Sequence, residues 1–319
     1  MAKRRLSKQQ SRRIKKAQLT IDLNDQNNLL GLVISHRGGE VEVEPADNSH
    51  NIMCKLRSNL GDIVCGDRVV YQDDGANPAI VALRPRDNLL QRQDGFGNIK
   101  SVASNVTQLI ICLALEPEPN FFLLDQYLLS AEQQGINALI LLNKIDLLDQ
   151  DNFDPYHLKA TYQPLGYTVL HCSIHNQQHI ERLQKLCQDQ VNVISGVSGV
   201  GKSSLTKAIL PELDIPVGEI SEVNREGKHT TRTSRLYHLP MGGDLIDTPG
   251  VRGFNPVIDQ HQSIAEGFRE IHELSATCQF HNCRHLNEPR CAVQQALENG
   301  TLAAQRYQSY LKLVQQPNQ

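Results

Sequence analysis

Residues 196–203 read Gly196-Val197-Ser198-Gly199-Val200-Gly201-Lys202-Ser203, a complete G-x-x-x-x-G-K-S phosphate loop, and Ser204 follows directly. The apolar run Val191–Ile194 before the loop is typical of a buried strand, and Ser203–Leu210 after it is compatible with a helix. A chance glycine-rich turn would lack this context. In such a loop, backbone N–H groups converge on phosphate oxygens at the positively polarised end of a helix. We therefore predict a nucleotide site in which Lys202 reaches the β- and γ-phosphates and Ser203 ligates Mg²⁺.

A second motif, Asn143-Lys144-Ile145-Asp146, follows the apolar run Asn137–Leu142. In N-K-x-D the aspartate carboxylate accepts hydrogens from N1 and N2 of guanine, and adenine lacks this donor pair. Leaving that carboxylate unpaired would disfavour ATP on the order of 10³-fold. The tetrapeptide alone is weak evidence, because an Asn–Lys turn after a strand is common. Beside a phosphate loop it predicts that the nucleotides are GTP and GDP.

The third motif is Asp247-Thr248-Pro249-Gly250, which follows the strand-like Leu245-Ile246 and lies 51 residues after Gly196. It matches the D-x-x-G of GTPases, in which Asp247 contacts Mg²⁺ through water and the Gly250 N–H senses the γ-phosphate. The preceding Gly227–Arg232 segment lacks apolar periodicity, which predicts a switch loop, a flexible surface loop, or both. Either Thr230 or Thr231 would complete the Mg²⁺ shell, and the sequence does not choose between them.

Catalysis poses a separate question, because Val251 follows Gly250 where Ras-like enzymes carry a water-orienting glutamine. The sequence therefore predicts slow intrinsic hydrolysis. His229 in the switch loop is the most economical substitute for positioning water. The alternative is that His229 contacts a partner.

The order of these motifs is unusual, because the base-reading motif at 143 precedes the phosphate loop at 196. A Ras-like chain presents the phosphate loop first and N-K-x-D last. The site can still assemble, since a doubly wound sheet gathers its loops at the carboxyl ends of its strands whatever the chain order. Ser173, after the predicted strand Tyr167–Cys172, is placed to support the base. Permutation also leads the chain from Gly250 straight into the C-terminal region.

The rest of the chain divides by pattern. Between Leu30 and Pro85, four or five short β-rich pieces separated by turn residues predict a small barrel. From about Asn105, long apolar strands alternate with helical stretches such as Phe121–Gln134, which predicts a parallel sheet covered on both faces. From about Gln260 the pattern becomes helical.

Three of the eight cysteines cluster near the C-terminal end, where Cys278, Cys283, His285 and Cys291 give C-x4-C-x-H-x5-C. Three thiolates and one imidazole suit tetrahedral Zn²⁺ in a structural site. His281 lies inside the cluster too, so spacing leaves the nitrogen ligand open, and a redox-sensitive or simply buried thiol group is the alternative. The other five cysteines read as reduced, mostly buried thiols. They are Cys54, Cys65, Cys112, Cys172 and Cys187.

Charge is unevenly placed, although the net charge is only −3. Residues 1–18 hold eight Lys or Arg and no acid, which leaves 24 bases against 35 acids and a net charge of −11 for the remainder. An acidic body with a basic arm favours contact with polyphosphate, and a solvated tail is the alternative. No apolar run is long enough to span a membrane, and the first residues do not resemble a secretory signal. We therefore expect a cytoplasmic protein that does not enter a membrane.

Taken together, these motifs resemble the ribosome small subunit-dependent GTPase A family (RsgA, also called YjeQ), and the resemblance covers nearly the whole chain. The turn Gly66-Asp67-Arg68-Val69 and the C-terminal pairs Arg306-Tyr307 and Ser309-Tyr310 also match. The chain departs from the family pattern at Thr107-Gln108, where Asp-Gln is usual, and at Lys228, where Arg is commoner. Neither departure touches the assigned nucleotide contacts.

The resemblance implies a multidomain protein with an N-terminal OB-fold β-barrel, a circularly permuted α/β P-loop GTPase domain and a C-terminal helical zinc-binding domain. We predict a basic disordered arm at 1–28, the OB-fold at 29–88, the GTPase domain at 89–256 and the zinc-binding domain at 257–319. By the same resemblance the zinc ligands are Cys278, Cys283, His285 and Cys291, which favours His285 over His281.

The resemblance further implies a GTP hydrolase that binds the small ribosomal subunit and its rRNA during late maturation. The subunit would stimulate hydrolysis to GDP and phosphate, and hydrolysis would time release, with assembly factors as further partners and no sign of oligomerisation. With 5% aromatics and no Trp, contact with the RNA backbone is favoured over base stacking. A P-loop kinase or ATPase is one alternative, opposed by N-K-I-D and D-T-P-G. A protein-binding GTPase switch with an inert basic tail is another.

Overall fold

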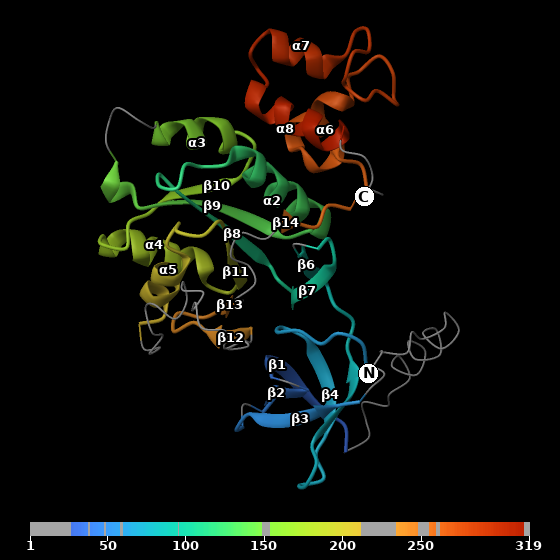
Figure 1. Ribbon diagram of the computed structural model, residues 1–319, viewed down its shortest axis with the longest axis vertical. Helices are drawn as coiled ribbons and strands as arrows, with labels where there is room; N and C mark the ends of the chain where they lie inside the picture. The colour runs from blue at the N-terminus through green and yellow to red at the C-terminus, as the bar shows by residue number, and fades with distance from the viewer. Residues whose placement is uncertain are drawn as a thin grey trace.

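The computed structural model describes residues 27–37, 39–47, 49–57, 60–94, 96–148, 154–211, 234–247, 255–259 and 262–315. Along the long axis of the molecule, a small barrel lies at one end and a helical C-terminal unit at the other, with an α/β unit between them (Figure 1). The basic stretch at 1–18, the predicted switch loop Gly227–Arg232 and Thr248–Gly250 fall outside the described residues.

The N-terminal barrel has five strands, as its punctuated β-rich pattern predicted. Their order is β1-β2-β3-β5-β4, and β4 pairs back with β1 to close the barrel, which is the arrangement of an OB-fold. Alternate residues point inward, so Val41 and Val43 of β2 are fully buried among Val33, Val69 and Ile80. The strands are β1 (Leu29–Arg37), β2 (Glu40–Pro45), β3 (Ile52–Leu56), β4 (Arg68–Gln72) and β5 (Ala79–Leu83).

The turn before β4 ties the barrel to the chain that leaves it. Asp67 is fully buried, and its carboxylate accepts hydrogen bonds from Arg86 at 2.6 and 2.7 Å and from the Ser104 hydroxyl at 2.6 Å. Gly66 precedes it with a φ of +88°, and a Cβ there would lie 2.3 Å from the carbonyl oxygen of Ser104. The close approach therefore requires glycine at position 66.

A separate three-stranded sheet follows the barrel, and the sequence patterns did not predict it. It contains β6 (Leu89–Gln93), β7 (Ile99–Ser104) and the short β14 (Asn255–Pro256), in the order β14-β6-β7. Because β14 pairs with β6, segments about 160 residues apart in the chain lie side by side.

The α/β unit carries six strands of the main sheet, in the order β10-β9-β8-β11-β13-β12. The first five are parallel, as predicted, and β12 is antiparallel to β13. The unpredicted β12 also pairs with β1, so the barrel and the α/β unit share one continuous sheet. The strands are β8 (Gln108–Ala114), β9 (Asn137–Asn143), β10 (Thr168–His171), β11 (Val191–Ser195), β12 (Arg235–His238) and β13 (Asp244–Asp247).

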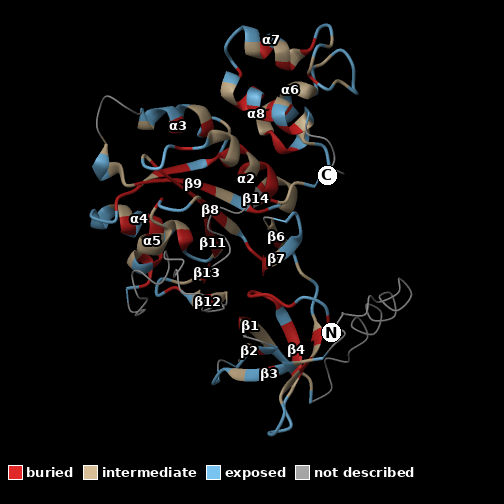
Figure 2. Ribbon diagram, in the orientation of Figure 1, coloured by how far each residue is buried: buried red, intermediate tan, exposed pale blue. Residues whose placement is uncertain are grey.

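Helices cover both faces of this sheet, because side chains alternate along each buried strand. Leu109 and Ile111 of β8 pack against α2 and α3, whereas Ile110 and Cys112 pack against α4 and α5. Figure 2 shows the buried residues concentrated along these strands and on the helix faces that meet them. The helices are α2 (Phe121–Gln134), α3 (Pro155–Tyr162), α4 (Gln177–Cys187) and α5 (Lys202–Ile209).

The C-terminal unit is helical, as predicted, and has a core of its own. Phe268, Ile271 and Leu313 are fully buried there, together with Leu129 from α2 of the α/β unit. Among the described helices, none combines the length and the apolar character that crossing a bilayer requires. The elements are η2 (Ala265–Gly267), α6 (Arg269–Ser275), α7 (Ala292–Glu298) and α8 (Ala304–Gln315).

Candidate nucleotide site and metal centre

The predicted phosphate loop joins the end of β11 to the start of α5 at Lys202. Gly196, Gly199 and Gly201 have φ values of +141°, +87° and +91°, which residues with a Cβ rarely adopt. A Cβ on Gly196 would lie 2.2 Å from the Cys112 carbonyl oxygen, and one on Gly201 would lie 2.4 Å from Asn143 Nδ2. The glycines therefore allow the loop to pack against β8 and β9 and to lead directly into the N-terminus of α5, the kind of helix end that binds anions.

Lys202 lies folded over this loop. Its Nζ donates hydrogen bonds to the carbonyl oxygens of Gly196, at 2.8 Å, and Val197, at 2.6 Å. These contacts hold the ammonium group beside the loop backbone, where the phosphate oxygens of a nucleotide would compete for it. Ser203 and Ser204 occupy the first turn of α5, both partly exposed.

The Asn143–Asp146 motif lies against the phosphate loop, although the two are distant in sequence. Asn143 is buried at the end of β9, and its Nδ2 donates a hydrogen bond of 2.9 Å to the carbonyl oxygen of Val200. Lys144 follows with a φ of +59°, and its Nζ donates to the carbonyl oxygen of Glu116 at 3.1 Å. A short 3-10 helix, η1 (Ile145–Leu147), then presents Asp146 at the surface. The Asn143–Asp146 motif and the phosphate loop thus lie side by side at the carboxyl ends of β9 and β11.

Ser173 supports Asp146 from the neighbouring strand end. The Ile145 N–H donates to the Cys172 carbonyl oxygen at 3.2 Å, which draws η1 towards the end of β10. Hydrogen bonding by the buried Ser173 lowers the pKa of the Asp146 carboxyl. Asp146 is therefore ionised at neutral pH and can accept two hydrogens, which is the property that reading guanine requires.

Asp247 is the residue of the predicted magnesium side, apart from Ser203, that falls within the described part of the chain. Asp247 ends β13, next to β11, whose Val193 pairs with Ile246. The sheet thus brings Asp247 to the edge where the phosphate loop begins, as expected for parallel strands. The other residues predicted for this side, namely His229, Thr230, Thr231 and Gly250, lie outside the described residues.

Two contacts of the site were not found from the sequence. Cys112 lies fully buried beneath the phosphate loop, with its Sγ 3.6 Å from the Val200 carbonyl oxygen. The loop after β8 approaches from the other side, where a Cβ on Gly199 would lie 3.4 Å from Pro117 Cδ. No sequence signal marks either residue, because both act through packing and backbone rather than through a motif.

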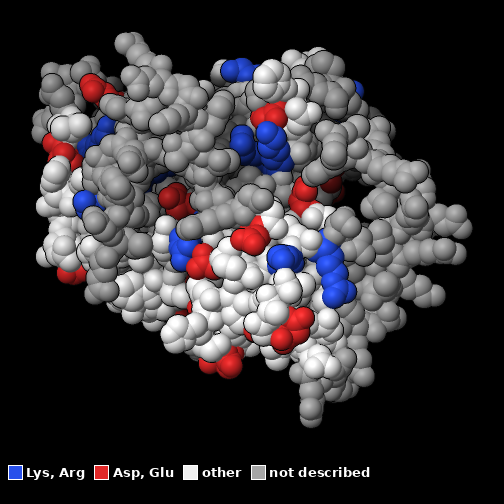
Figure 3. Space-filling model, turned by 60° about the horizontal axis from the view of Figure 1, so that its bottom comes forward, with Lys and Arg blue, Asp and Glu red and all other residues white. Residues whose placement is uncertain are grey.

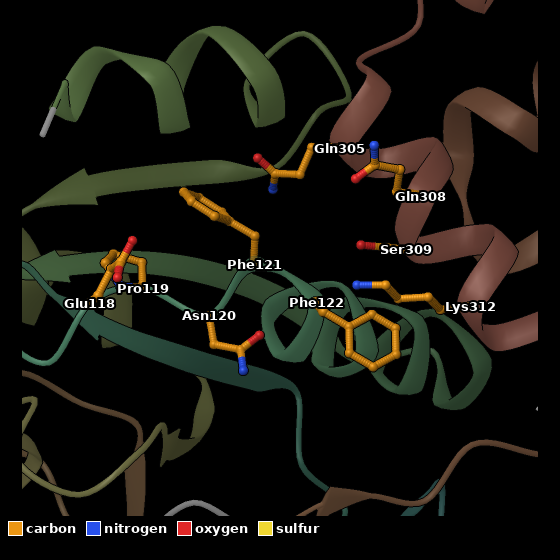
Figure 4. A pocket seen from close by; sticks show the side chains of 9 residues that line it. All are labelled: Glu118, Pro119, Asn120, Phe121, Phe122, Gln305, Gln308, Ser309 and Lys312. Atoms are coloured by element: carbon orange, nitrogen blue, oxygen red, sulfur yellow. The ribbon is translucent and has the colours of Figure 1, made fainter.

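A hollow of about 480 Å³ lies at the junction between the α/β unit and the C-terminal unit. Figure 4 shows side chains of α8, including Lys312, on one side and those of residues 118–122 on the other. None of the predicted nucleotide or metal residues lines it. Its lining residues are Glu118, Pro119, Asn120, Phe121, Phe122, Gln305, Gln308, Ser309 and Lys312.

The predicted metal centre is assembled in the C-terminal unit. One ligand atom from each of Cys278, Cys283, His285 and Cys291 lies within 4.8 Å of the others. His285 Nδ1 is 3.6 Å from Cys278 Sγ and 3.5 Å from Cys291 Sγ. His281 is exposed and does not belong to this group. Three sulfurs and one nitrogen around one point suit a tetrahedral metal ion.

The surroundings of His285 fix its ring for this task. Ser275 Oγ donates its only hydrogen to the Ile271 carbonyl oxygen at 2.6 Å. It can therefore only accept from His285 Nε2, which is 2.9 Å away, so Nδ1 carries the free lone pair that faces the sulfurs. Tyr307 further donates to the His285 carbonyl oxygen at 2.6 Å. The donor set and its support fit a structural metal ion.

The other five cysteines, predicted as buried thiols, are all buried.

Known proteins match this arrangement over the whole chain. The sequence profile of the RsgA GTPase family matches residues 83–256. The small ribosomal subunit biogenesis GTPase RsgA of Saccharophagus degradans is 41% identical, covering 99% of this chain and 97% of the relative. The same-named protein of Pseudomonas savastanoi is 42% identical, covering 98% of each.

Two solved structures share the fold. YjeQ from Thermotoga maritima matches with a TM-score of 0.74 and 31% identity, covering 90% of this chain and 97% of that one. YloQ, described as a circularly permuted GTPase, matches with a TM-score of 0.70 and 28% identity, covering 94% and 100%. The chain, with its barrel, its permuted P-loop unit and its helical Cys₃His unit, belongs to the RsgA GTPase family of GTP-hydrolysing P-loop enzymes.

Proposed function

We propose that this protein binds the small ribosomal subunit during its late maturation, hydrolyses GTP to GDP and phosphate when the subunit stimulates it, and uses hydrolysis to time its release. The names of its relatives supply the subunit as the partner. The hydrogen bond between Asn143 and Val200 is the observation that carries the nucleotide assignment. It joins the guanine-reading loop to the phosphate loop across 57 residues of chain.

In this proposal, the phosphate loop Gly196–Ser204 holds the phosphates through its backbone N–H groups and Lys202. Asp146 reads guanine, and the hydrogen bond with Ser173 lowers the pKa of its carboxyl. Mg²⁺ would be held by the Ser203 hydroxyl and, through water, by Asp247, and would neutralise charge on the β- and γ-phosphates. Asp247 supports this role because it ends the strand next to β11.

Water attack is assigned to the switch region. Val251 stands where a water-orienting glutamine is usual, so intrinsic turnover is slow. His229 either positions the water or contacts the subunit, and Thr230 or Thr231 completes the magnesium shell. GTP turnover of His229→Ala with subunits present separates the two roles of His229: unchanged stimulated turnover eliminates the catalytic one.

The metal of the C-terminal unit is proposed to be a structural Zn²⁺ held by Cys278, Cys283, His285 and Cys291. Thiolate ligands and a closed four-donor set favour zinc over magnesium or calcium. Its role is to fix the segment between α6 and α7, which supplies all four ligands, and α8 is tied to this segment by the hydrogen bond from Tyr307 to the His285 carbonyl oxygen.

Contact with rRNA is proposed for the basic arm and the barrel. On the face shown in Figure 3, blue and red side chains are interspersed over the described part of the surface, so its folded portion is not a single positive patch. The eight bases of residues 1–18 are therefore the main source of attraction to phosphate.

The deciding experiment measures GTP hydrolysis by the full chain with isolated small subunits, with large subunits, and with neither. We expect strong stimulation by small subunits only. Equal stimulation by both, or by neither, would contradict the proposal. Binding to small subunits at rising salt, with and without residues 1–18, tests the arm: a salt dependence that weakens on deletion marks phosphate contact. A salt dependence that deletion leaves unchanged would favour a switch that binds protein.

A further inference from the structure

The strand pairing between the barrel and the α/β unit is made at one residue of β12, Arg235. Its backbone pairs with Ser35 of β1 on one side and with Asp247 of β13 on the other. Arg235 also follows the predicted switch loop Gly227–Arg232 closely in sequence. One residue thus lies between the barrel and the proposed magnesium aspartate.

The side chain of Arg235 adds a second connection to the barrel. Its guanidinium donates two hydrogen bonds to Glu42 of β2, at 2.7 and 3.0 Å, in the bidentate geometry that fixes both groups. Ser35 and Asn51 donate to the same carboxylate at 2.7 and 2.9 Å. Every described partner of Glu42 other than Arg235 therefore belongs to the barrel.

Glu42 and Arg235 are both charged at neutral pH. Burial opposes ionisation of Glu42, but hydrogen bonds from Asn51, Arg235 and Ser35 outweigh it and lower its pKa to about 2. The side chains of Arg235 and Glu42 are 32% and 14% exposed. A pair that keeps some contact with water can open and close, whereas opening a fully buried pair would leave two charges without water or a partner.

A second polar contact lies further along β12. His238 lies between Asp244 of β13, at 2.6 Å, and Glu44 of β2, at 3.0 Å. Arg235 and His238 thus connect the same two strands, β12 and β2, at two points. Together they hold the barrel in register with the strand that carries Asp247.

We propose that Arg235 and Glu42 form a positioning pair, the Arg235–Glu42 clamp, through which contact of the barrel with its partner sets the position of Asp247 and thereby stimulates hydrolysis. This inference rests on the proposed function, since it explains how the subunit acts on the nucleotide site. It also has a reciprocal consequence. If barrel contact changes nucleotide binding, the nucleotide state must change the affinity of the barrel for its partner by the same factor.

Turnover measurements with the full chain test the clamp. Glu42→Gln and Arg235→Lys should leave basal GTP turnover within about twofold, reduce subunit-stimulated turnover by about tenfold, and leave the Kd for subunits nearly unchanged. The double charge exchange Glu42→Arg with Arg235→Glu should recover part of the stimulation. Full stimulation in both single variants, or a loss that only follows weaker subunit binding, would overturn the clamp.

A matched control exists in the pair Arg269–Glu132, which has a 2.7 Å contact and side chains 38% and 24% exposed but joins α6 to α2 instead of the barrel to β12. Glu132→Gln should leave stimulated turnover at the wild-type value. An equal loss in Glu132→Gln and Glu42→Gln would show a general effect of losing an ion pair, and the clamp would be wrong.

Hydrogen exchange provides a test that needs no subunit. With a non-hydrolysable GTP analogue in place of GDP, exchange in β1 and β2 should change in the wild type, and Glu42→Gln should abolish the change. If exchange in these strands is the same with either nucleotide, the clamp does not link the two units, whatever the subunit does. If the wild-type enzyme shows no stimulation by subunits, the proposed function fails, and the exchange result still judges the clamp.

Discussion

The two ends of the α/β unit are joined to their neighbours by similar chemistry at very different depths. At the barrel, Arg235 and Glu42 meet at a partly exposed edge with one residue pair between β1 and β12. At the C-terminal unit, Arg306 of α8 is 1% exposed and donates to Asp125 of α2 at 2.6 Å and to Glu270 of α6 at 2.6 and 3.0 Å. Both junctions use an arginine and carboxylates.

The burial of the charged side chains determines whether each junction can open. The Arg306 guanidinium also lies 4.4 Å from the Phe268 ring centroid, and Leu129 of α2 is buried in the core of the C-terminal unit. Separating that junction would expose apolar surface and leave buried charges without partners, which costs several kcal/mol. Opening the Arg235–Glu42 clamp exchanges one partly exposed contact for water and leaves the buried packing of Ile34 and Cys65 in place. The Arg306 contact is therefore rigid, and the clamp is the adjustable contact of the barrel junction.

Metal removal should produce the largest difference between the two junctions, because it should loosen the C-terminal unit and leave the barrel unchanged. Cys283→Ser, or chelation of the metal, should reduce bound zinc from about one per chain to near zero and release hydrogen-exchange protection throughout α6, α7 and α8. Protection of β1–β5 should not change, because the described contacts of the barrel with other elements include β7 and β12, which lie outside the C-terminal unit. Equal loosening of the barrel would contradict the comparison, and so would full protection of α8 without metal.

Removing a carboxylate from the buried cluster of Arg306, Asp125 and Glu270 should give the next largest effect. Asp125→Ala removes one partner of Arg306 and leaves its charge partly unpaired, so the free energy of opening α8 should fall by about 3–5 kcal/mol. Native-state hydrogen exchange of α8 measures this quantity. Glu132→Gln breaks the more exposed contact with Arg269 at the same junction and should cost less than about 1 kcal/mol. Similar losses in the two variants would show that depth is not decisive.

Packing at this junction should contribute less. A Cβ on Gly267 would lie 2.0 Å from Leu129 Cδ1, inside the shared core. Gly267→Ala should therefore lower the free energy of opening α8 by about 1–3 kcal/mol. Adding Leu129→Ala should make the combined loss smaller than the sum of the two single losses, because the clash is relieved. A fully additive pair would show that the two residues do not meet.

The smallest effect is expected from pH at the barrel junction. Burial lowers the pKa of His238, but hydrogen bonds and charges from Asp244 and Glu44 outweigh it, so the pKa lies above its usual 6.5. The charged contact is thus fully present below pH 6.5 and is lost as pH rises through the elevated pKa. Exchange of β2 and β12 amides, corrected for intrinsic rates, should become faster over that range. His238→Gln should remove the change, and an unchanged profile in that variant would assign it to another group.

The nucleotide motifs could be predicted because local geometry demands particular residues. Gly196 and Gly201 are needed because a Cβ at either position would clash with Cys112 or Asn143. Parallel strands bring the loops that follow them to one edge of the sheet. The Cys₃His cluster was visible because its ligands are close in sequence. Spacing left His281 open and the family resemblance favoured His285. The structure leaves His281 out of the group and shows Ser275 behind His285.

Both junctions escaped sequence reasoning for the same reason. Glu42 and Arg235 are 193 residues apart, and Asp125 and Arg306 are 181 apart, so no local periodicity links them. Each reads as an ordinary surface charge until tertiary packing sets its partner. β12 was missed as well, because the strand has only four residues and its burial alternates weakly. Local sequence patterns do not indicate contacts that form only when two units dock.

The most direct test of the proposed function is the nucleotide preference of the full chain, because that function depends on Asp146 and Lys202 binding opposite ends of one guanosine triphosphate. In competition binding with Mg²⁺ present, GTP should bind on the order of 10³-fold more tightly than ATP. Asp146→Asn should remove that preference and favour xanthosine triphosphate, whose base presents an oxygen where guanine presents an amino group. Equal affinities of the wild-type protein for GTP and ATP would contradict the account.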